Sequence, residues 1–112
     1  MKADAVHGHL DLLILSVLSR GAAHGYAVAE AIRIRSDGEF DLREGTLYPA
    51  LYRLEGAGLL SSKWQDVGGR RRRVYALTRA GRRALEGRTQ EWTAFSHAVS
   101  RVIGASRRTE PA

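Results

Sequence analysis

The stretch Leu42–Leu60, with the sequence LREGTLYPALYRLEGAGLL, predicts a helix with two dissimilar faces. Leu47, Leu51 and Leu54 recur at spacings of four and three residues, which places them on one side that can pack against a core. The opposite side carries hydroxyl, aromatic and guanidinium groups, namely Thr46, Tyr48, Tyr52 and Arg53. Aromatic rings among hydrogen-bonding groups favour a surface that docks a partner over an ordinary solvated face.

The bounds of this helix follow from its glycines and from Pro49. The glycines at positions 56 and 58 are poor helix formers that readily reach positive φ, so the helix is expected to end there. Pro49 permits two interpretations: a helix that begins near Glu44 and bends at the proline, or one that begins at Tyr48 with the proline in its first turn. We favour the longer helix, because it keeps the leucines before and after the proline on one stripe.

The segment after the helix, Lys63–Leu77 with the sequence KWQDVGGRRRRVYAL, predicts a β-hairpin. Residues 60–64 alternate apolar with small or polar side chains, as a half-buried strand does, and residues 74–77 are expected to return. Residues 66–69 supply the reversal, and four arginines, Arg70 to Arg73, are expected along one side of the hairpin. A helix followed by a basic hairpin is the order of elements in a winged helix.

Two helices are expected before this unit. Residues 9–20 carry an apolar stripe at i, i+3, i+4, i+7 and i+8 spacing, and residues 25–36 are expected to form a second helix with Tyr26 facing inward. Asp11 is expected in the first turn of the first helix, where the helix dipole favours an anion. Residues 1–8 are expected to be frayed.

A long last helix is expected after Thr78, which is a suitable N-cap. The spacings between its apolar residues are seven, three, four and three positions, which is close to the heptad pattern of a coiled coil. The residues of this seam are Leu85, Trp92, Phe95, Val99 and Val102. Because the earlier helices already fill a small core, this seam is expected to pair with a second copy of the chain. A second interpretation is that the paired Trp92 rings flank a gap in which a flat apolar or aromatic molecule stacks.

The 112 residues suffice for one domain, and their charge is unevenly distributed. The net charge is +6, with six basic against eight acidic groups in residues 1–62 and twelve against four in residues 63–112. This segregation favours an anionic partner, either nucleic acid or a membrane surface. No cysteine, membrane-length apolar run, metal-ligand cluster or catalytic motif is present in the sequence. We therefore expect a cytoplasmic protein that is not an enzyme and holds no cofactor.

The arginine run and the tyrosines each have a structural interpretation beside the functional one. Four arginines can form a solvated charge run, but their position on a hairpin beside an exposed aromatic helix favours contacts to DNA phosphates. The third helix would then read bases in the major groove. Tyr48 and Tyr52 can reach phosphates or thymine methyl groups, or either one can pack under the second helix.

These segments together resemble the PadR family of transcriptional regulators, in its short subtype with a single C-terminal helix. The matching segments are GHLDLLILSVLSRG at 8–21, HGYAVAEAI at 24–32, EGTLYPALYRLEGAGLL at 44–60, RRRVYALTRAGRRAL at 71–85 and WTAF at 92–95. The TLYPALYRLE core is highly specific, because a Tyr-Pro inside a recognition helix is hardly seen elsewhere. The resemblance implies a homodimeric winged-helix repressor that binds palindromic promoter DNA and is released by small, typically aromatic, molecules.

The residue patterns and the resemblance together assign two sets of residues. Those expected to contact DNA are Arg43, Thr46, Tyr48, Pro49, Tyr52, Arg53, Lys63, Arg70, Arg71, Arg72 and Arg73. Those expected at the dimer or effector surface are Leu85, Trp92, Phe95, Val99 and Val102. Arg43 stands where the family commonly has a serine, which removes the expected helix cap and adds a phosphate contact.

We therefore expect a mainly α fold with a small β-hairpin. Residues 1–77 would form a winged helix-turn-helix domain, residues 78–104 a dimerisation helix and residues 105–112 a disordered tail. The expected partners are palindromic double-stranded DNA, a second copy of the chain and a small aromatic or apolar effector, with no membrane partner. One alternative is a winged-helix module that binds protein and has lost DNA binding. Another is a membrane-surface protein, which burial of Trp92 and Phe95 in a pairing seam disfavours.

Overall fold

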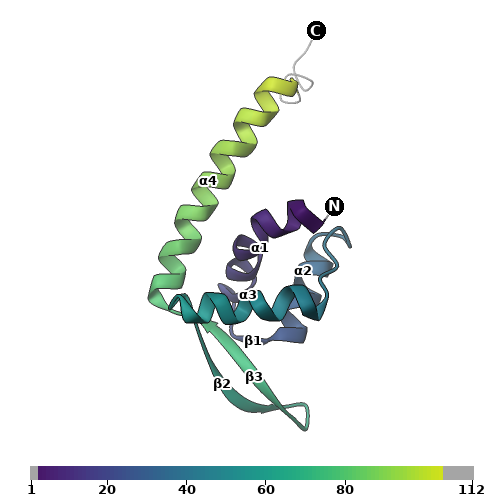
Figure 1. Ribbon diagram of the computed structural model, residues 1–112, viewed down its shortest axis with the longest axis vertical. Helices are drawn as coiled ribbons and strands as arrows, with labels where there is room; N and C mark the ends of the chain where they lie inside the picture. The colour runs from purple at the N-terminus through teal and green to yellow at the C-terminus, as the bar shows by residue number, and fades with distance from the viewer. Residues whose placement is uncertain (1–2, 105–112) are drawn as a thin grey trace.

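Between residues 3 and 104, the part of the chain that the computed structural model describes, four helices and a three-stranded antiparallel sheet build the fold (Figure 1). Side chains are described from residue 9 onward. The elements in chain order are α1 (Ala3–Leu18), β1 (Ala23–His24), α2 (Gly25–Arg35), α3 (Glu44–Gly56), β2 (Leu60–Val67), β3 (Arg70–Leu77) and α4 (Arg79–Ile103). Within this part of the chain, no helix combines the length and the apolar character that crossing a membrane requires.

The core lies between α1, α2 and α3, because each helix turns its apolar stripe inward. Ile14 of α1, Val28 of α2 and Leu51 of α3 are completely buried, and Tyr75 of β3 joins the same cluster. Burying an aliphatic side chain of this size stabilises a fold by about 1.5–3 kcal/mol. The stripes that the sequence predicted on the first and third helices are confirmed.

Tyr26 is the exception, because it was expected to face inward and is exposed. Val28 and Ile32 are four residues apart and define the buried side of α2. Tyr26 precedes Val28 by two residues, about 200° around the helix, so its ring points out of the core. There it stacks against His24, with the ring centroids 6.4 Å apart.

α1 begins earlier and ends sooner than the sequence predicted. Residues 3–8, which were expected to be frayed, continue the helix, and it ends at Leu18 rather than at Arg20. Asp11 therefore lies in the middle of α1 and not in its first turn, so the helix dipole does not explain its charge. The expected disordered tail, residues 105–112, lies outside the described residues.

α3 is the longer of the two helices that the sequence allowed, because it begins at Glu44 and contains Pro49. Its N-cap is Arg43, whose side chain makes no capping hydrogen bond. The helix ends at Gly56, and Gly58 follows with a φ of 81°, as the glycine pair predicted.

The hairpin is longer than predicted and turns more tightly. Val67 pairs with Arg70, so the loop consists of Gly68 and Gly69 alone, with φ values of 59° and 82°. Two consecutive positive φ values suit a two-residue hairpin turn, and glycine adopts them without a Cβ penalty. β1 was not predicted at all. It pairs Ala23 with Tyr75 and completes the sheet order β1-β3-β2.

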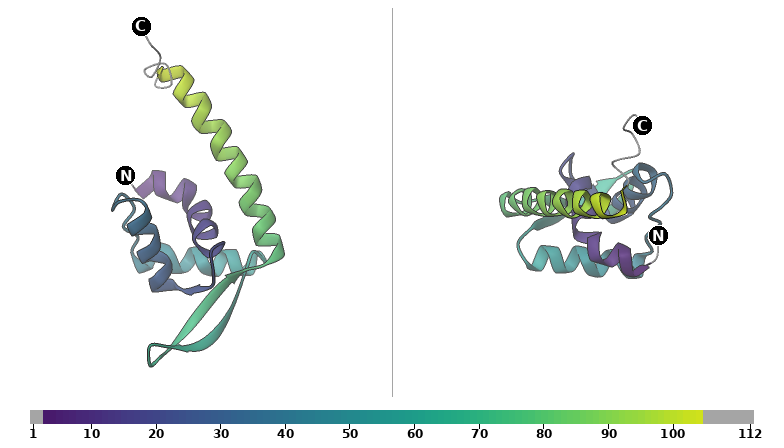
Figure 2. Two further views of the ribbon diagram at one scale, coloured as in Figure 1. Left: turned by 180° about the vertical axis from the view of Figure 1, so that it is seen from behind. Right: turned by 90° about the horizontal axis from the view of Figure 1, so that it is seen from above.

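α4 is joined to the winged domain at its first turn. The Thr78 hydroxyl accepts a hydrogen bond from the Gly81 amide at 3.0 Å and donates one to the Gly58 carbonyl at 2.6 Å, which confirms the predicted cap. A Cβ at Gly81 would collide with the Leu59 carbonyl, so this close approach requires glycine. The C-terminal end of α4 extends clear of the helical body (Figures 1 and 2).

Candidate nucleic-acid interface

The β2–β3 hairpin, which we call the wing, projects away from the helices next to α3 (Figure 1). Side chains of α3, of the wing and of the start of α2 line a groove between them. This α3–wing groove has a volume of about 290 Å³. Its lining is aromatic and basic, and consists of His24, Gly25, Tyr48, Tyr52, Trp64, Arg71, Arg72, Arg73 and Tyr75. The groove therefore brings together residues from both segments that the sequence singled out, the third helix and the arginine run.

The two tyrosines of α3 have different environments. Tyr48 is half-buried and packs against the core, with its ring beside the first residue of α2, Gly25. Tyr52 is 62% exposed. The sequence left open which tyrosine packs under the second helix, and the structure identifies Tyr48. Tyr52 is free to contact a partner.

We expect Gly25→Ala to destabilise the protein, because a Cβ at this position would lie 2.6 Å from the Tyr48 hydroxyl oxygen and 2.7 Å from two ring carbons. Overpacking of this kind costs about 1–3 kcal/mol in the free energy of unfolding, which urea denaturation measures. Gly87→Ala is the matched control, because nothing lies within 4 Å of its Cβ position in α4, and it should stabilise. Equal effects of the two substitutions would contradict the proposed contact.

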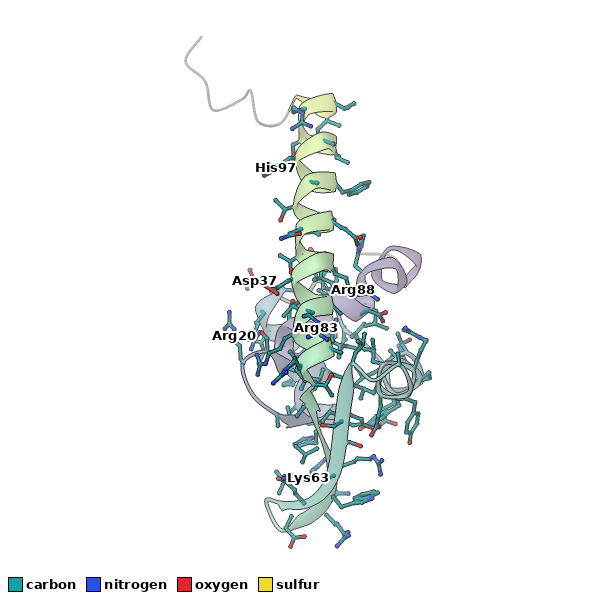
Figure 3. All side chains as sticks on the ribbon, turned by 90° about the vertical axis from the view of Figure 1, so that its left-hand side faces the viewer. Arg20, Asp37, Lys63, Arg83, Arg88 and His97 are labelled. Atoms are coloured by element: carbon teal, nitrogen blue, oxygen red, sulfur yellow. The ribbon has the colours of Figure 1, made fainter. Side chains whose placement is uncertain are left out.

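The four wing arginines lie on both faces of the hairpin, not on one side. Successive residues of a strand point to opposite faces. Arg71 and Arg73 share the face of Trp64 and stand over its ring, each guanidinium 5.7 Å from the ring centroid. Arg70 and Arg72 take the opposite face, together with the exposed Lys63, which Figure 3 labels.

Arg73 is committed to a contact within the protein. Its Nε donates a hydrogen bond to Ser62 Oγ at 2.8 Å, and Ser62 Oγ donates to Glu55 Oε2 at 2.7 Å. Its Nη2 also lies 3.8 Å from Glu55 Oε2. The chain of contacts ties the wing to the last turn of α3, so Arg73 fixes the groove's shape. Arg70 and Arg71 are exposed and remain available to a partner.

The N-terminal end of α3 borders a second hollow of about 520 Å³, between α2 and the loop before α3. Arg43 and Pro49 are exposed near this end, and Thr46 is half-buried. The charges here are mixed. Arg33 is paired with Glu30 at 3.0 Å, and Asp41 and Glu44 also line the hollow. The N-terminal end of α3 is therefore less uniformly basic than the wing.

Arg53 is held by an ion cluster with α1 and α4 that the sequence did not reveal. Its Nη2 and Nη1 donate hydrogen bonds to the two carboxylate oxygens of Asp11 on α1, at 2.8 and 3.0 Å. Arg88 of α4 lies 3.6 Å from the same carboxylate. The hydrogen bonds from Arg53 lower the pKa of Asp11 below its ordinary value, against the opposing effect of burial, and the charges of Arg53 and Arg88 lower it further. The three helices thus meet at one ionised carboxylate.

His24 caps α2 inside the α3–wing groove. Its Nδ1 accepts a hydrogen bond from the Ala27 amide at 3.3 Å, which requires the neutral ring. Burial lowers the pKa of His24, and the positive charge of Arg72 lowers it further. The histidine therefore acts as a helix cap. Among the described residues, no group of three or more His, Cys, Asp or Glu side chains is arranged to bind a metal ion.

The apolar seam predicted on the last helix is exposed over its distal part. Trp92, Phe95, Val99 and Val102 are all exposed, with Phe95 at 58% and Val102 at 86%. Leu85 differs from them, because it is half-buried against the core of its own domain and is already covered within the protomer.

A small pocket lies between α1 and α4, where His9 meets Trp92 edge to face with the ring centroids 5.1 Å apart. This α1–α4 pocket has a volume of about 220 Å³. Its lining residues are His9, Leu12, Arg88, Glu91, Trp92 and Phe95. Arg88 therefore belongs both to the pocket wall and to the ion cluster around Asp11.

Comparison with known proteins gives concordant matches. Residues 14–87 match the family described as transcriptional regulator PadR-like. The chain is 32% identical over 106 residues to the transcriptional regulator YqjI of Escherichia coli, covering 94% of this chain and 50% of that protein. A transcriptional regulator from Clostridium thermocellum has a similar structure, with a TM-score of 0.82 and 31% identity over 90% of this chain and 96% of that one. For a PadR family regulator from Clostridium difficile the TM-score is 0.75 and the identity 35%, over 85% and 98% of the two chains.

Proposed function

The chain belongs to the transcriptional regulator PadR-like family, and on that premise we propose that it is a repressor that binds a palindromic operator as a dimer. Each protomer would place α3 in a major groove and the wing on flanking phosphates. The α3–wing groove carries this proposal, because basic and aromatic side chains from a helix and a hairpin line one space. With DNA as its partner, the protein would act in the cytoplasm.

Within this interface we assign different tasks to the predicted residues. The exposed Arg70 and Arg71, with Arg72 and Lys63 on the wing's other face, would contact phosphates, which gives affinity without reading sequence. Tyr52 and the N-terminal residues of α3 would reach base edges. Tyr48 and Arg73 would contribute by holding α3 and the wing in place, because both are engaged within the protein.

The dimer would form through α4. A helix whose aromatic and β-branched side chains are exposed at Trp92, Phe95, Val99 and Val102 leaves a large apolar stripe in water, which pairing with a second copy would bury. Because α4 extends clear of its own body, a partner helix can reach this stripe (Figure 2). The spacing of the two α3 helices would then be set by the crossing of the two α4 helices.

Footprinting on genomic fragments selected by the purified protein tests the operator proposal. Two protected half-sites with inverted symmetry are expected, with centres about one helical turn, roughly 34 Å, apart. Protection of a single half-site, or of fragments with no shared symmetry, would contradict the dimeric operator complex.

We also propose that a small aromatic effector binds beside Trp92, in the α1–α4 pocket or between two paired α4 helices. The pocket offers an indole, a phenyl ring and the Arg88 guanidinium to one ligand. A ligand that prefers a tilted α4 pair would lower operator affinity by shifting the population of dimers.

Trp92→Phe is expected to keep operator affinity within about threefold, because a phenyl ring preserves the apolar seam of α4, and to abolish quenching of tryptophan fluorescence by aromatic ligands. The reason is that Trp92 lies at the pocket, whereas the second tryptophan, Trp64, lies on the wing. The matched control is Trp64→Phe, which should retain the quenching. Quenching that persists in Trp92→Phe and is lost in Trp64→Phe would move the ligand site to the wing.

A further inference from the structure

We propose that Asp11 is a positioning residue that controls how far Arg53 is available to DNA, and that Arg88 links this control to the α1–α4 pocket. When a ligand in the pocket draws Arg88 away, the Asp11 carboxylate is left to Arg53 alone and DNA binding weakens. The inference rests on the proposed role of α3 in DNA binding, and it supplies a route from the pocket to that helix within one protomer.

The geometry of the carboxylate supports the first half of this proposal. Both Asp11 oxygens accept hydrogen bonds from the terminal nitrogens of Arg53, at 2.8 and 3.0 Å. The Asp11 side chain is only 15% exposed, whereas that of Arg53 is 59% exposed. The shielded carboxylate of Asp11 thus binds both terminal nitrogens of Arg53, while the rest of the Arg53 side chain faces solvent. Arg53 can reach a phosphate only by giving up, or sharing, a bidentate contact of the strongest kind.

The position of Arg88 supports the second half. Its Nη2 lies 3.6 Å from Asp11 Oδ2, which is also the acceptor of the Arg53 Nη1 hydrogen bond. The two arginines therefore compete for one oxygen, and each weakens the hold of the carboxylate on the other. Arg88 also lines the pocket that contains Trp92 and Phe95. An anionic or hydrogen-bond-accepting group in that pocket would recruit Arg88 and strengthen the contact between Asp11 and Arg53.

Asp11→Asn tests the first half in the full-length protein. In this variant Arg53 is no longer held by a carboxylate. It should tighten binding to an operator fragment by about threefold to tenfold and steepen the slope of log affinity against log salt by up to about 1.8, one additional phosphate contact in each protomer. Glu86→Gln removes the same charge from an exposed position of α4 outside the pocket lining and should leave the slope unchanged. The gain must disappear in an Arg53→Met background. An Asp11→Asn variant that binds as the native protein does, or more weakly, overturns the proposal.

Arg88→Met tests the link to the pocket. It should weaken operator binding about twofold to fivefold, and the loss should vanish when Arg53→Met is combined with it, because coupled residues are not additive. Arg82→Met removes an exposed charge from the same helix, and its effect should be additive with Arg53→Met. This double-mutant cycle of Arg88 and Arg53 leaves Asp11 unchanged, so it tests the coupling between the two arginines even if Asp11→Asn fails to fold. Additive effects of Arg88→Met and Arg53→Met would overturn the link.

The outcomes also separate this inference from the proposed function. A native protein that binds no DNA fragment even in dilute salt contradicts the operator proposal itself. A native protein that binds DNA with a steep salt slope, while the Arg88 and Arg53 substitutions remain additive, leaves the operator proposal standing and refutes the Asp11 route.

Discussion

Operator affinity is expected to fall by about a hundredfold or more when Arg71 and Arg72 are both replaced by glutamate, because two charge-assisted contacts of roughly 1.5–3 kcal/mol each are lost. The two arginines lie on opposite faces of the wing and both line the α3–wing groove. Glutamate also repels the phosphates that these side chains would otherwise contact. Fluorescence anisotropy with a labelled operator fragment measures the loss directly.

The salt dependence of the same titration shows whether lost phosphate contacts cause the fall in operator affinity. Each phosphate contact contributes about 0.9 to the slope of log affinity against log salt, so losing two in each protomer, four in the dimer, should reduce it by about 3.6. The matched control is the pair Arg82→Glu and Arg83→Glu, which makes the same change in net charge on exposed positions of α4 (Figure 3 labels Arg83). An unchanged slope in the wing variant would favour a winged-helix module that binds protein instead of DNA.

Arg71 requires a second variant, because its guanidinium stands over the Trp64 ring. Replacing Arg71 and Arg72 by glutamine removes the charges without placing a carboxylate beside the indole. This variant should keep the native free energy of unfolding within about 0.5 kcal/mol, as surface substitutions usually do, while still reducing the salt slope. If the glutamine variant also binds the operator weakly, lost phosphate contacts, and not a distorted wing, explain the affinity loss of the glutamate variant.

The sequence predicted the parts of this fold that depend on local periodicity. The leucine stripe of α3, the cap at Thr78 and the glycine turn of the wing each depend on residues a few positions apart, and all three are present. The PadR resemblance is confirmed by the family match over residues 14–87. The long apolar seam of α4 was visible for the same reason, although its first member, Leu85, is covered by its own domain.

What the sequence could not predict are contacts between residues far apart in the chain. β1 consists of two residues, too few for an alternating pattern, and it exists because β3 offers it an edge. Arg53 on α3 and Asp11 on α1 are separated by 42 positions, and neither has a local signal for pairing. Arg73 looked like its three neighbours in the arginine run, yet only the folded hairpin brings it to Ser62 and Glu55. Among the predicted DNA-binding residues, Arg53 and Arg73 are therefore engaged by acidic side chains of the protein itself.

Combining Phe95→Glu with Val99→Glu is expected to convert the dimer to a monomer and, through that change alone, to lower operator affinity by about a hundredfold or more. Both residues lie on the exposed seam of α4, four positions apart and therefore on the same side of the helix. In a symmetric dimer the two substitutions place four carboxylates in an apolar interface, where burying an unpaired charge is strongly unfavourable. Sedimentation velocity at micromolar concentration measures the change in oligomeric state.

The affinity loss follows from how two half-sites are bound. In a dimer, binding of the second winged domain is intramolecular, and linkage of this kind raises overall affinity by about 10² to 10⁴ over a single domain. A monomer retains the α3–wing groove, so its affinity for an isolated half-site should stay within about threefold of the native protein. The control is His97→Glu, which adds a carboxylate on the side of α4 away from the seam (Figure 3 labels His97) and should remain dimeric. If the double variant sediments as a dimer, or if it binds the full operator as tightly as the native protein, α4 is not the element that joins the two DNA-binding domains.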